Sequence, residues 1–123
     1  MAVEEYRALV LEDDRDAADL LRITLERHAR MRVDVVGTAD DALVALGRQQ
    51  YDVLVTDIQL PGRSGLAILS EVRAIDPALT VMVVTAFPTF DNAVAALRES
   101  ADEFLVKPVA ATLVVERATE LAA

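Results

Sequence analysis

Residues 51–62 read Tyr51-Asp52-Val53-Leu54-Val55-Thr56-Asp57-Ile58-Gln59-Leu60-Pro61-Gly62: a short apolar strand, then a carboxylate, then a turn. The β-forming run Val53–Thr56 is typical of a strand that is buried on both faces of a parallel sheet. Leu60-Pro61-Gly62 then turns the chain away. Open α/β sheets bind their ligands at the carboxyl ends of the strands. We therefore expect Asp57 at that edge, as a metal ligand, a nucleophile or a helix cap.

The composition is that of one small globular domain. The chain has 123 residues, and 54% of them are hydrophobic, which is enough for one buried core. Only 4% are aromatic, so the core must be aliphatic. The formal net charge of −9 argues against direct binding to nucleic acids or to an anionic membrane surface, because both need clustered positive charge.

Several other classes of protein are disfavoured. There is no cysteine, so neither a disulfide framework nor thiolate chemistry is expected. The N-terminus, Met1-Ala2-Val3-Glu4-Glu5-Tyr6, lacks the basic and then apolar pattern of a signal peptide. No apolar run approaches the roughly 18 residues of a membrane span. We therefore expect a cytoplasmic protein.

Five short strands are expected to alternate with five helices. This alternation predicts right-handed crossovers and a doubly wound α/β fold, with helices on both faces of a five-stranded parallel sheet. The expected strands are Ala8–Leu11, Arg32–Val36, Val53–Thr56, Thr80–Val84 and Glu103–Val106. The expected helices run from after Asp14 to about His28, from Thr38 to Gly47, from Leu66 to Ile75, up to about Arg98, and from about Ala110 to Leu121.

Local signals place some of the helix ends. Asp14 is expected to cap the first helix. Thr38-Ala39-Asp40-Asp41 resembles a capping box at the start of the second helix, and Gly47 is expected to end that helix. Asp76-Pro77 is expected to close the third.

Polar residues follow four of the five expected strands. Because parallel strands end at one edge, these residues should converge there. Carboxylates so close together repel one another unless a cation lies among them, and hard oxygen ligands favour Mg²⁺, with Mn²⁺ as a substitute. With a lysine and a hydroxyl, the set suits aspartyl-phosphate chemistry. The residues are Glu12 and Asp13 after the first strand, Asp57 after the third, Thr85 at the end of the fourth and Lys107 after the fifth.

In order and spacing, this set resembles the receiver domain of bacterial two-component response regulators. The matching pieces are Glu12-Asp13, Asp57, Leu60-Pro61 with Gly65, Thr85-Ala86 and Lys107-Pro108. The resemblance covers essentially the whole chain. It implies a flavodoxin-like (βα)5 fold with strand order 2-1-3-4-5. It also implies one receiver domain over residues 1–123, either as a complete small protein or as the N-terminal part of a longer one.

The resemblance implies a role for each site residue. Asp57 resembles the phosphoacceptor, which takes a phosphoryl group from a sensor histidine kinase or a phosphotransfer protein. Asp13 resembles the direct Mg²⁺ ligand, with Glu12 assisting through water and Gln59 ligating through its backbone carbonyl. Lys107 would contact the phosphoryl group.

The resemblance also implies a signalling switch rather than an enzyme. Thr85 would hydrogen-bond the phosphoryl group, and Phe104 occupies the aromatic switch position. The face formed by the fourth helix, fifth strand and fifth helix would then change and select an output domain or a downstream partner. A homodimer formed through this face on activation is a further expectation.

Three other functions are compatible with parts of the pattern. A degenerate receiver would act as an interaction module without phosphorylation. A phosphatase of the haloacid-dehalogenase type would resemble Asp-x-Asp, but Gln59 stands two residues after Asp57. A flavodoxin-like cofactor binder would need a phosphate-binding loop after the first strand, where Glu12-Asp13-Asp14 would repel an anion.

Overall fold

The structure, a computed structural model, describes residues 6–28, 30–57, 68–85, 89–98, 101–106, 116–117 and 119–121. Five strands form one parallel sheet in the order β2-β1-β3-β4-β5, which confirms the predicted fold class and strand order. The strands are β1 (Arg7–Leu11), β2 (Arg32–Val36), β3 (Val53–Thr56), β4 (Thr80–Thr85) and β5 (Glu103–Val106). The helices are α1 (Arg15–His28), α2 (Ala39–Arg48), α3 (Leu69–Ile75) and α4 (Phe90–Arg98).

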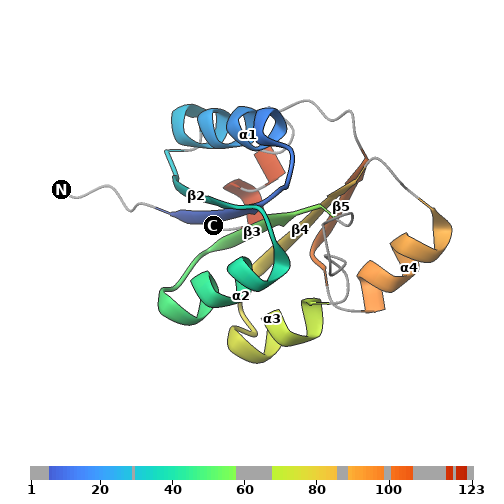
Figure 1. The fold of residues 1–123 in the computed structure, drawn as a ribbon. Helices are drawn as coiled ribbons and strands as arrows, with labels where there is room; N and C mark the ends of the chain where they lie inside the picture. The colour runs from blue at the N-terminus through green and yellow to red at the C-terminus, as the bar shows by residue number, and fades with distance from the viewer. Residues whose placement is uncertain are drawn as a thin grey trace.

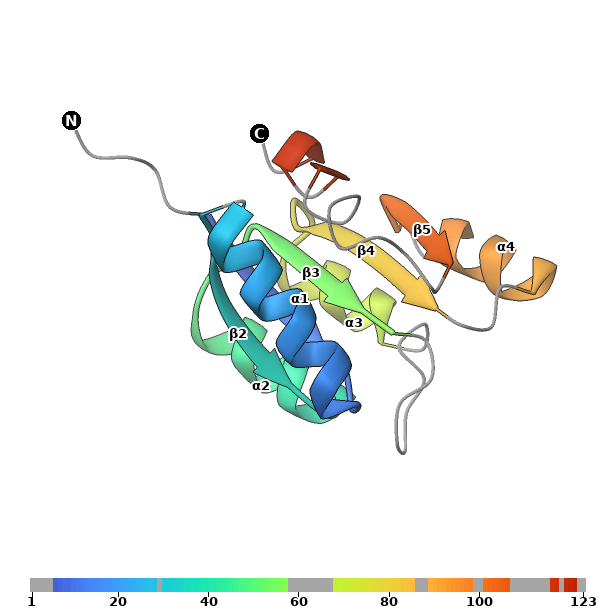
Figure 2. The same cartoon turned by 90° about the horizontal axis from the view of Figure 1, so that it is seen from above.

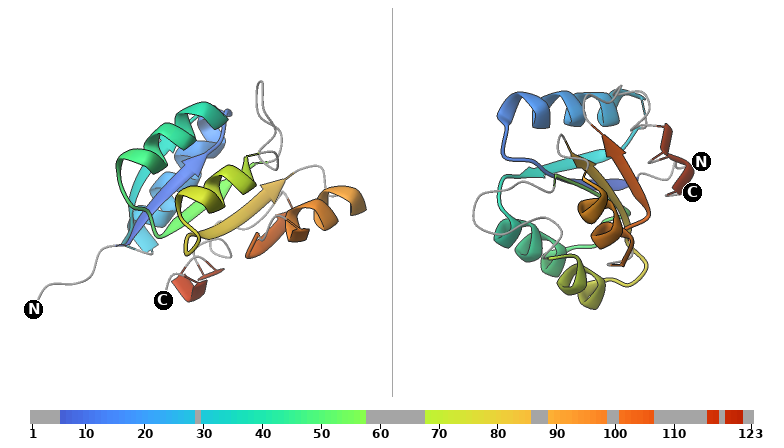
Figure 3. Two further views of the ribbon diagram at one scale, coloured as in Figure 1. Left: turned by 90° about the horizontal axis from the view of Figure 1, so that it is seen from below. Right: turned by 90° about the vertical axis from the view of Figure 1, so that its right-hand side faces the viewer.

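Helices cover both faces of the sheet. Helix α1 lies on one face, while α2 and α3 lie on the other (Figure 1). Helices α2, α3 and α4 follow one another along the sheet in the order of the chain (Figure 3). The strands all point the same way, so their carboxyl ends meet at one edge of the molecule (Figure 2).

Burial explains the sequence pattern of each strand. The central strands β1, β3 and β4 are buried almost throughout, as their continuous apolar runs predicted. Strand β2, with its alternating sequence, and strand β5 form the two edges and are more exposed. Two apolar clusters pack against the two faces, one centred on Leu9, Leu54 and Val83 and the other on Val10, Val55 and Leu25 of α1.

Two of the predicted helices fall partly outside the described residues. The third was expected from Leu66, which lies outside the described residues, and α3 begins at Leu69. As predicted, α3 ends at Asp76, whose backbone N–H donates to the carbonyl of Val72. The last helix was expected over about residues 110–121, of which 116–117 and 119–121 are described and helical.

The helix starts agree with the predicted caps. Asp14 caps α1, because its Oδ1 accepts hydrogen bonds from the backbone N–H groups of Asp16 and Ala17, at 2.9 and 3.1 Å. Thr38 caps α2, since its hydroxyl accepts from the N–H of Asp41 at 3.1 Å. Helix capping therefore accounts for the acidic residue at position 14.

The predicted end of α2 is wrong. The helix continues through Gly47 to Arg48 and ends at Gln49, which has an extended backbone. The side chain of Gln49 explains the later end, because it donates to Asp34 Oδ2 at 2.8 Å and to the Tyr51 hydroxyl at 2.6 Å. These bonds fix the chain as it leaves the helix, so no left-handed glycine is needed.

Replacing Gly47 by alanine should stabilise the protein. An added Cβ meets no atom within 4 Å. Alanine also loses less conformational entropy in a helix, so the free energy of unfolding should rise by about 0.5–1 kcal/mol. Urea denaturation of Gly47→Ala checks this. A loss of stability would instead indicate that Gly47 adopts a left-handed conformation and ends the helix.

Two aspartates lie at the edge of the sheet where the strands begin, and each makes the same pair of hydrogen bonds to a neighbouring strand. Asp52 immediately precedes β3, and its Oδ2 accepts from the N–H of Arg7 at 2.8 Å, while its own N–H donates to the Arg7 carbonyl at 2.8 Å. Asp102 precedes β5 and makes the same pair with Val81, at 2.7 and 2.8 Å. Each aspartate therefore sets the register of its strand against a neighbour.

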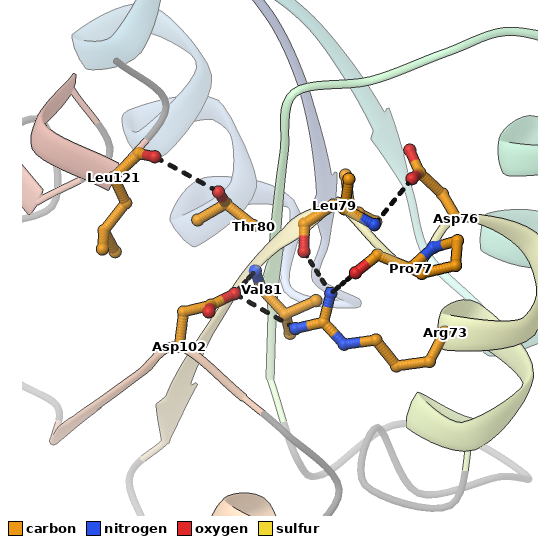
Figure 4. A network of polar contacts seen from close by, with 9 residues as sticks. Arg73, Asp76, Pro77, Leu79, Thr80, Val81, Asp102 and Leu121 are labelled. Carbon is orange, nitrogen blue, oxygen red and sulfur yellow. Dashed lines mark hydrogen bonds and ion pairs between the residues drawn. The ribbon is translucent and has the colours of Figure 1, made fainter.

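The side chain of Asp102 has a further partner in Arg73 (Figure 4). Its guanidinium donates to Asp102 Oδ2 at 3.1 Å and also to the carbonyls of Pro77 and Leu79. These contacts join the end of α3, the turn before β4 and the start of β5.

Removing the Asp102 carboxylate should destabilise the protein more than removing that of Asp52. Val81 is fully buried, so Asp102→Ala leaves its N–H without an acceptor and should cost about 1–3 kcal/mol. The bond of Asp52 to Arg7 is exposed to water, which can replace it. Urea denaturation of the two alanine variants makes the comparison. An equal loss of stability in the two variants would show that burial of the bonded N–H group does not determine the size of the loss.

Candidate functional site

The register of β1 and β3 brings two of the predicted carboxylates side by side. Leu11 is paired with Thr56, so Glu12 and Asp57 are the next residues on adjacent parallel strands. The N–H of Asp57 donates to the Leu11 carbonyl at 3.1 Å, and the N–H of Glu12 donates to the Val36 carbonyl at 3.0 Å. Both acidic residues therefore have their backbones fixed by a neighbouring strand at the carboxyl edge.

The predicted acidic residues differ in exposure. Glu12 is buried, with 5% of its surface exposed, and Asp57 is half-buried. Asp13 is exposed, at the point where the chain leaves β1 for α1. The solvent exposure of the three carboxylates therefore increases from Glu12 through Asp57 to Asp13. Hard oxygen donors of this kind suit Mg²⁺ or Mn²⁺.

Side chains alone do not make a complete metal centre in the described ranges. Among those residues, no group of three or more acidic, histidine or cysteine side chains is gathered closely enough to hold a metal ion. The predicted set needs fewer direct side-chain ligands, because in it only Asp13 and Asp57 would ligate directly and Glu12 would act through water. The backbone carbonyl of Gln59 and the amino group of Lys107 lie outside the described residues.

Thr85 and Phe104 lie on neighbouring strands. Thr85 is the last residue of β4, is fully buried and pairs with Val106 of β5. Phe104 pairs with Val83 and packs against the apolar cluster on the same face. Because side chains alternate along a strand, Thr85 projects to the same face as Val83 and Phe104. Thr85 and Phe104 are therefore diagonal neighbours on one face of two adjacent strands.

Thr56 makes a contact that its place in a β-forming run does not predict. Its buried hydroxyl donates to the backbone carbonyl of Asp57 at 3.0 Å. The available signal was a hydroxyl at the end of the otherwise apolar run Val53–Val55, directly before the carboxylate.

None of the helices in the described part of the chain is both long enough and apolar enough to cross a membrane.

Comparison with known proteins agrees with this geometry. Residues 8–119 match the family described as the response regulator receiver domain. Response regulator protein PilR of Pseudomonas aeruginosa is 35% identical over 109 residues, which cover 87% of this chain and 24% of PilR. The chain spans about a quarter of the length of the curated relatives that it matches first.

Solved structures of receivers superpose closely. A CheY-like response regulator receiver domain protein from Methanospirillum hungatei JF-1 has a TM-score of 0.92 and 25% identity, with 97% of this chain and 94% of that chain covered. A response regulator from Burkholderia pseudomallei, solved with a phosphorylated aspartic acid, a calcium ion and citrate, has a TM-score of 0.86 and 26% identity. That match covers 95% of this chain and 71% of the other.

The family model, the 35% identical relative and the sheet order agree with one another. They confirm the resemblance inferred from the ordered set of strand-end residues. The chain belongs to the receiver-domain family of two-component response regulators, whose members are signalling domains.

Proposed function

We propose that the chain is a phosphoacceptor signalling domain and that Asp57 is the residue modified. The observation that carries this proposal is the pairing of Leu11 with Thr56, which sets Glu12 beside Asp57 at the carboxyl edge of the central strands. Asp57 is half-buried with its backbone anchored, so its carboxylate has a defined direction but remains accessible. The neighbour from Burkholderia pseudomallei, which carries a phosphorylated aspartic acid, supports the same chemistry here.

In the proposed reaction, Asp57 is the nucleophile. One carboxylate oxygen forms a bond to the phosphorus of a phosphohistidine on a sensor histidine kinase or a phosphotransfer protein. The P–N bond of the donor breaks, and its electron pair returns to the imidazole nitrogen. The product is an acyl phosphate on Asp57, which adds about −1.5 to −2 charge to this edge of the sheet.

The donor set at this edge fits a bound Mg²⁺, for which Mn²⁺ could substitute. Asp13 and Asp57 would ligate it through their carboxylates, Gln59 through its backbone carbonyl, and Glu12 through water. When bound, the metal would neutralise charge that develops on the phosphoryl oxygens. Lys107 is proposed to pair with one of these oxygens, and Thr85 to donate its hydroxyl to another.

Phosphorylation is proposed to shift the domain between two conformations. Thr85, which is buried at the end of β4, would turn toward the phosphoryl group, and Phe104 of β5 would pack into the space beside it. The face formed by α4, β5 and the last predicted helix would change as a result. This proposed change is supported by the position of Thr85 and Phe104 on the same face of the sheet.

We further propose that residues 1–123 form one receiver domain that controls an output domain or a downstream partner. Support comes from the curated relatives, of which this chain matches only about a quarter. A homodimer of activated receivers through the face of α4, β5 and the last predicted helix is also proposed. A cytoplasmic location, where sensor kinases present their phosphohistidine, fits this function.

Formation of a phosphoryl adduct tests the role of Asp57 directly. Incubation with acetyl phosphate and Mg²⁺ should add one phosphoryl group to the wild-type chain, and Asp57→Asn should remove the adduct because an amide is no nucleophile. Omitting Mg²⁺ should suppress it. Intact-protein mass spectrometry measures all three.

Asp52→Asn is the matched control for this experiment. It makes the same change in an exposed aspartate at the opposite edge of the sheet, so its adduct should equal that of the wild type. If the wild-type chain took no adduct under conditions that modify another receiver, the proposal would fail. The domain would then be an interaction module that works without phosphorylation.

A second prediction concerns the switch. Amide hydrogen exchange in β5 should change when the wild-type chain is phosphorylated, whereas Thr85→Ala should lose most of that change while still forming the adduct. Thr80→Ala, at the other end of β4, is the control and should respond like the wild type. An unaltered β5 response in Thr85→Ala would contradict the role assigned to its hydroxyl.

A further inference from the structure

Thr56 occupies the last paired layer of the central strands. It lies between Leu11 of β1 and Val83 of β4, both fully buried, and only 1% of its own surface is exposed. It projects to the same face as Leu54, two residues earlier. An apolar β-branched residue would fit this environment, so the hydroxyl needs an explanation.

The hydroxyl of Thr56 complements the strand hydrogen bonds at Asp57. The N–H of Asp57 is held by the Leu11 carbonyl at 3.1 Å. The Asp57 carbonyl accepts from Thr56 Oγ1 at 3.0 Å. β1 ends at Leu11, and Thr56 holds the second polar group of the Asp57 backbone from within β3.

We propose that Thr56 is a positioning residue for the phosphoacceptor. Its hydroxyl fixes the peptide plane that follows Asp57 and so fixes the direction of the Asp57 carboxylate relative to Glu12. Phosphoryl transfer needs the attacking oxygen in line with the leaving group, and small misplacements are costly in such reactions. This inference rests on the proposed function, because it assigns Thr56 to the same site.

A purely structural role for the hydroxyl predicts a different result. Buried hydroxyls commonly bond a nearby carbonyl, and their loss lowers stability without touching chemistry. Thr24 provides a matched example in α1, where its hydroxyl donates to the Leu20 carbonyl at 2.6 Å, away from the carboxyl edge. Thr24→Val therefore controls for the loss of a buried hydroxyl bond alone.

The test measures the rate of Mg²⁺-dependent modification over a range of acetyl phosphate concentrations. Thr56→Val should lower the maximal rate constant by about three- to tenfold, the effect of one lost hydrogen bond, with the half-saturating donor concentration unchanged. Thr56→Ala should show the same loss. Thr56→Ser keeps the hydroxyl and should stay within about twofold of wild type, and Thr24→Val should match wild type.

A second readout follows the hydrogen bond directly. The carbonyl ¹³C resonance of Asp57 should shift in Thr56→Val and return toward its wild-type position in Thr56→Ser. Thr56→Ala and Thr56→Ser differ only by the hydroxyl. If the valine variant does not fold, comparison of these two variants shows whether the hydroxyl is required.

The outcomes separate the two proposals. An adduct on wild-type Asp57, with equal maximal rate constants in Thr56→Ala and Thr56→Ser, would overturn the role of Thr56 and leave the proposed function standing. A wild-type chain without any adduct would overturn both. A loss of rate in Thr24→Val as large as in Thr56→Val would also overturn the positioning role, because stability alone would then explain it.

Discussion

The pairing of β1 with β3 is the constraint on which the rest of the structure depends. Both strands are buried on their two faces, so their register is set by packing as well as by hydrogen bonds. Because Leu11 lies opposite Thr56, the first residues beyond the pair are Glu12 and Asp57. Burial of the apolar side chains of β1 and β3 thus brings two carboxylates together at the carboxyl edge of the sheet. A slip of one residue would turn the side chains of β3 to the wrong face and separate the pair.

The two ends of the sheet use aspartate for different purposes. At the N-terminal edge, Asp52 and Asp102 accept backbone N–H groups and set strand register, and Asp102 also pairs with Arg73. At the carboxyl edge, Asp57 has its backbone groups satisfied by Leu11 and Thr56. Its side chain is therefore not needed to hold those backbone groups in place. A domain with a net charge of −9 can in this way use some carboxylates for structure and leave others for the proposed chemistry.

Much of the fold could be predicted from sequence because apolar runs and their alternation with helical patterns are local signals. The continuous run Val53–Thr56 predicted a central strand, and Asp14 and Thr38 marked helix starts correctly. Gly47 was misinterpreted because the end of α2 is set by side-chain contacts of Gln49 with Asp34 and Tyr51, which come from other elements. The sequence shows a hydroxyl directly before Asp57, but the bond from Thr56 to the Asp57 carbonyl also depends on a rotamer, which that signal does not specify. The roles of Gln59 and Lys107 stay predictions, since both lie outside the described residues.

The most direct measurement of the central claim is a crystal structure of the chain grown with Mg²⁺ and beryllofluoride, which mimics an acyl phosphate. Beryllofluoride should be bonded to a carboxylate oxygen of Asp57, a metal ion should contact Asp13 and Asp57, and the Thr85 hydroxyl should be turned toward the fluorides. Beryllofluoride bound at another residue, or a carboxyl edge without ligand under conditions that load another receiver, would contradict the claim.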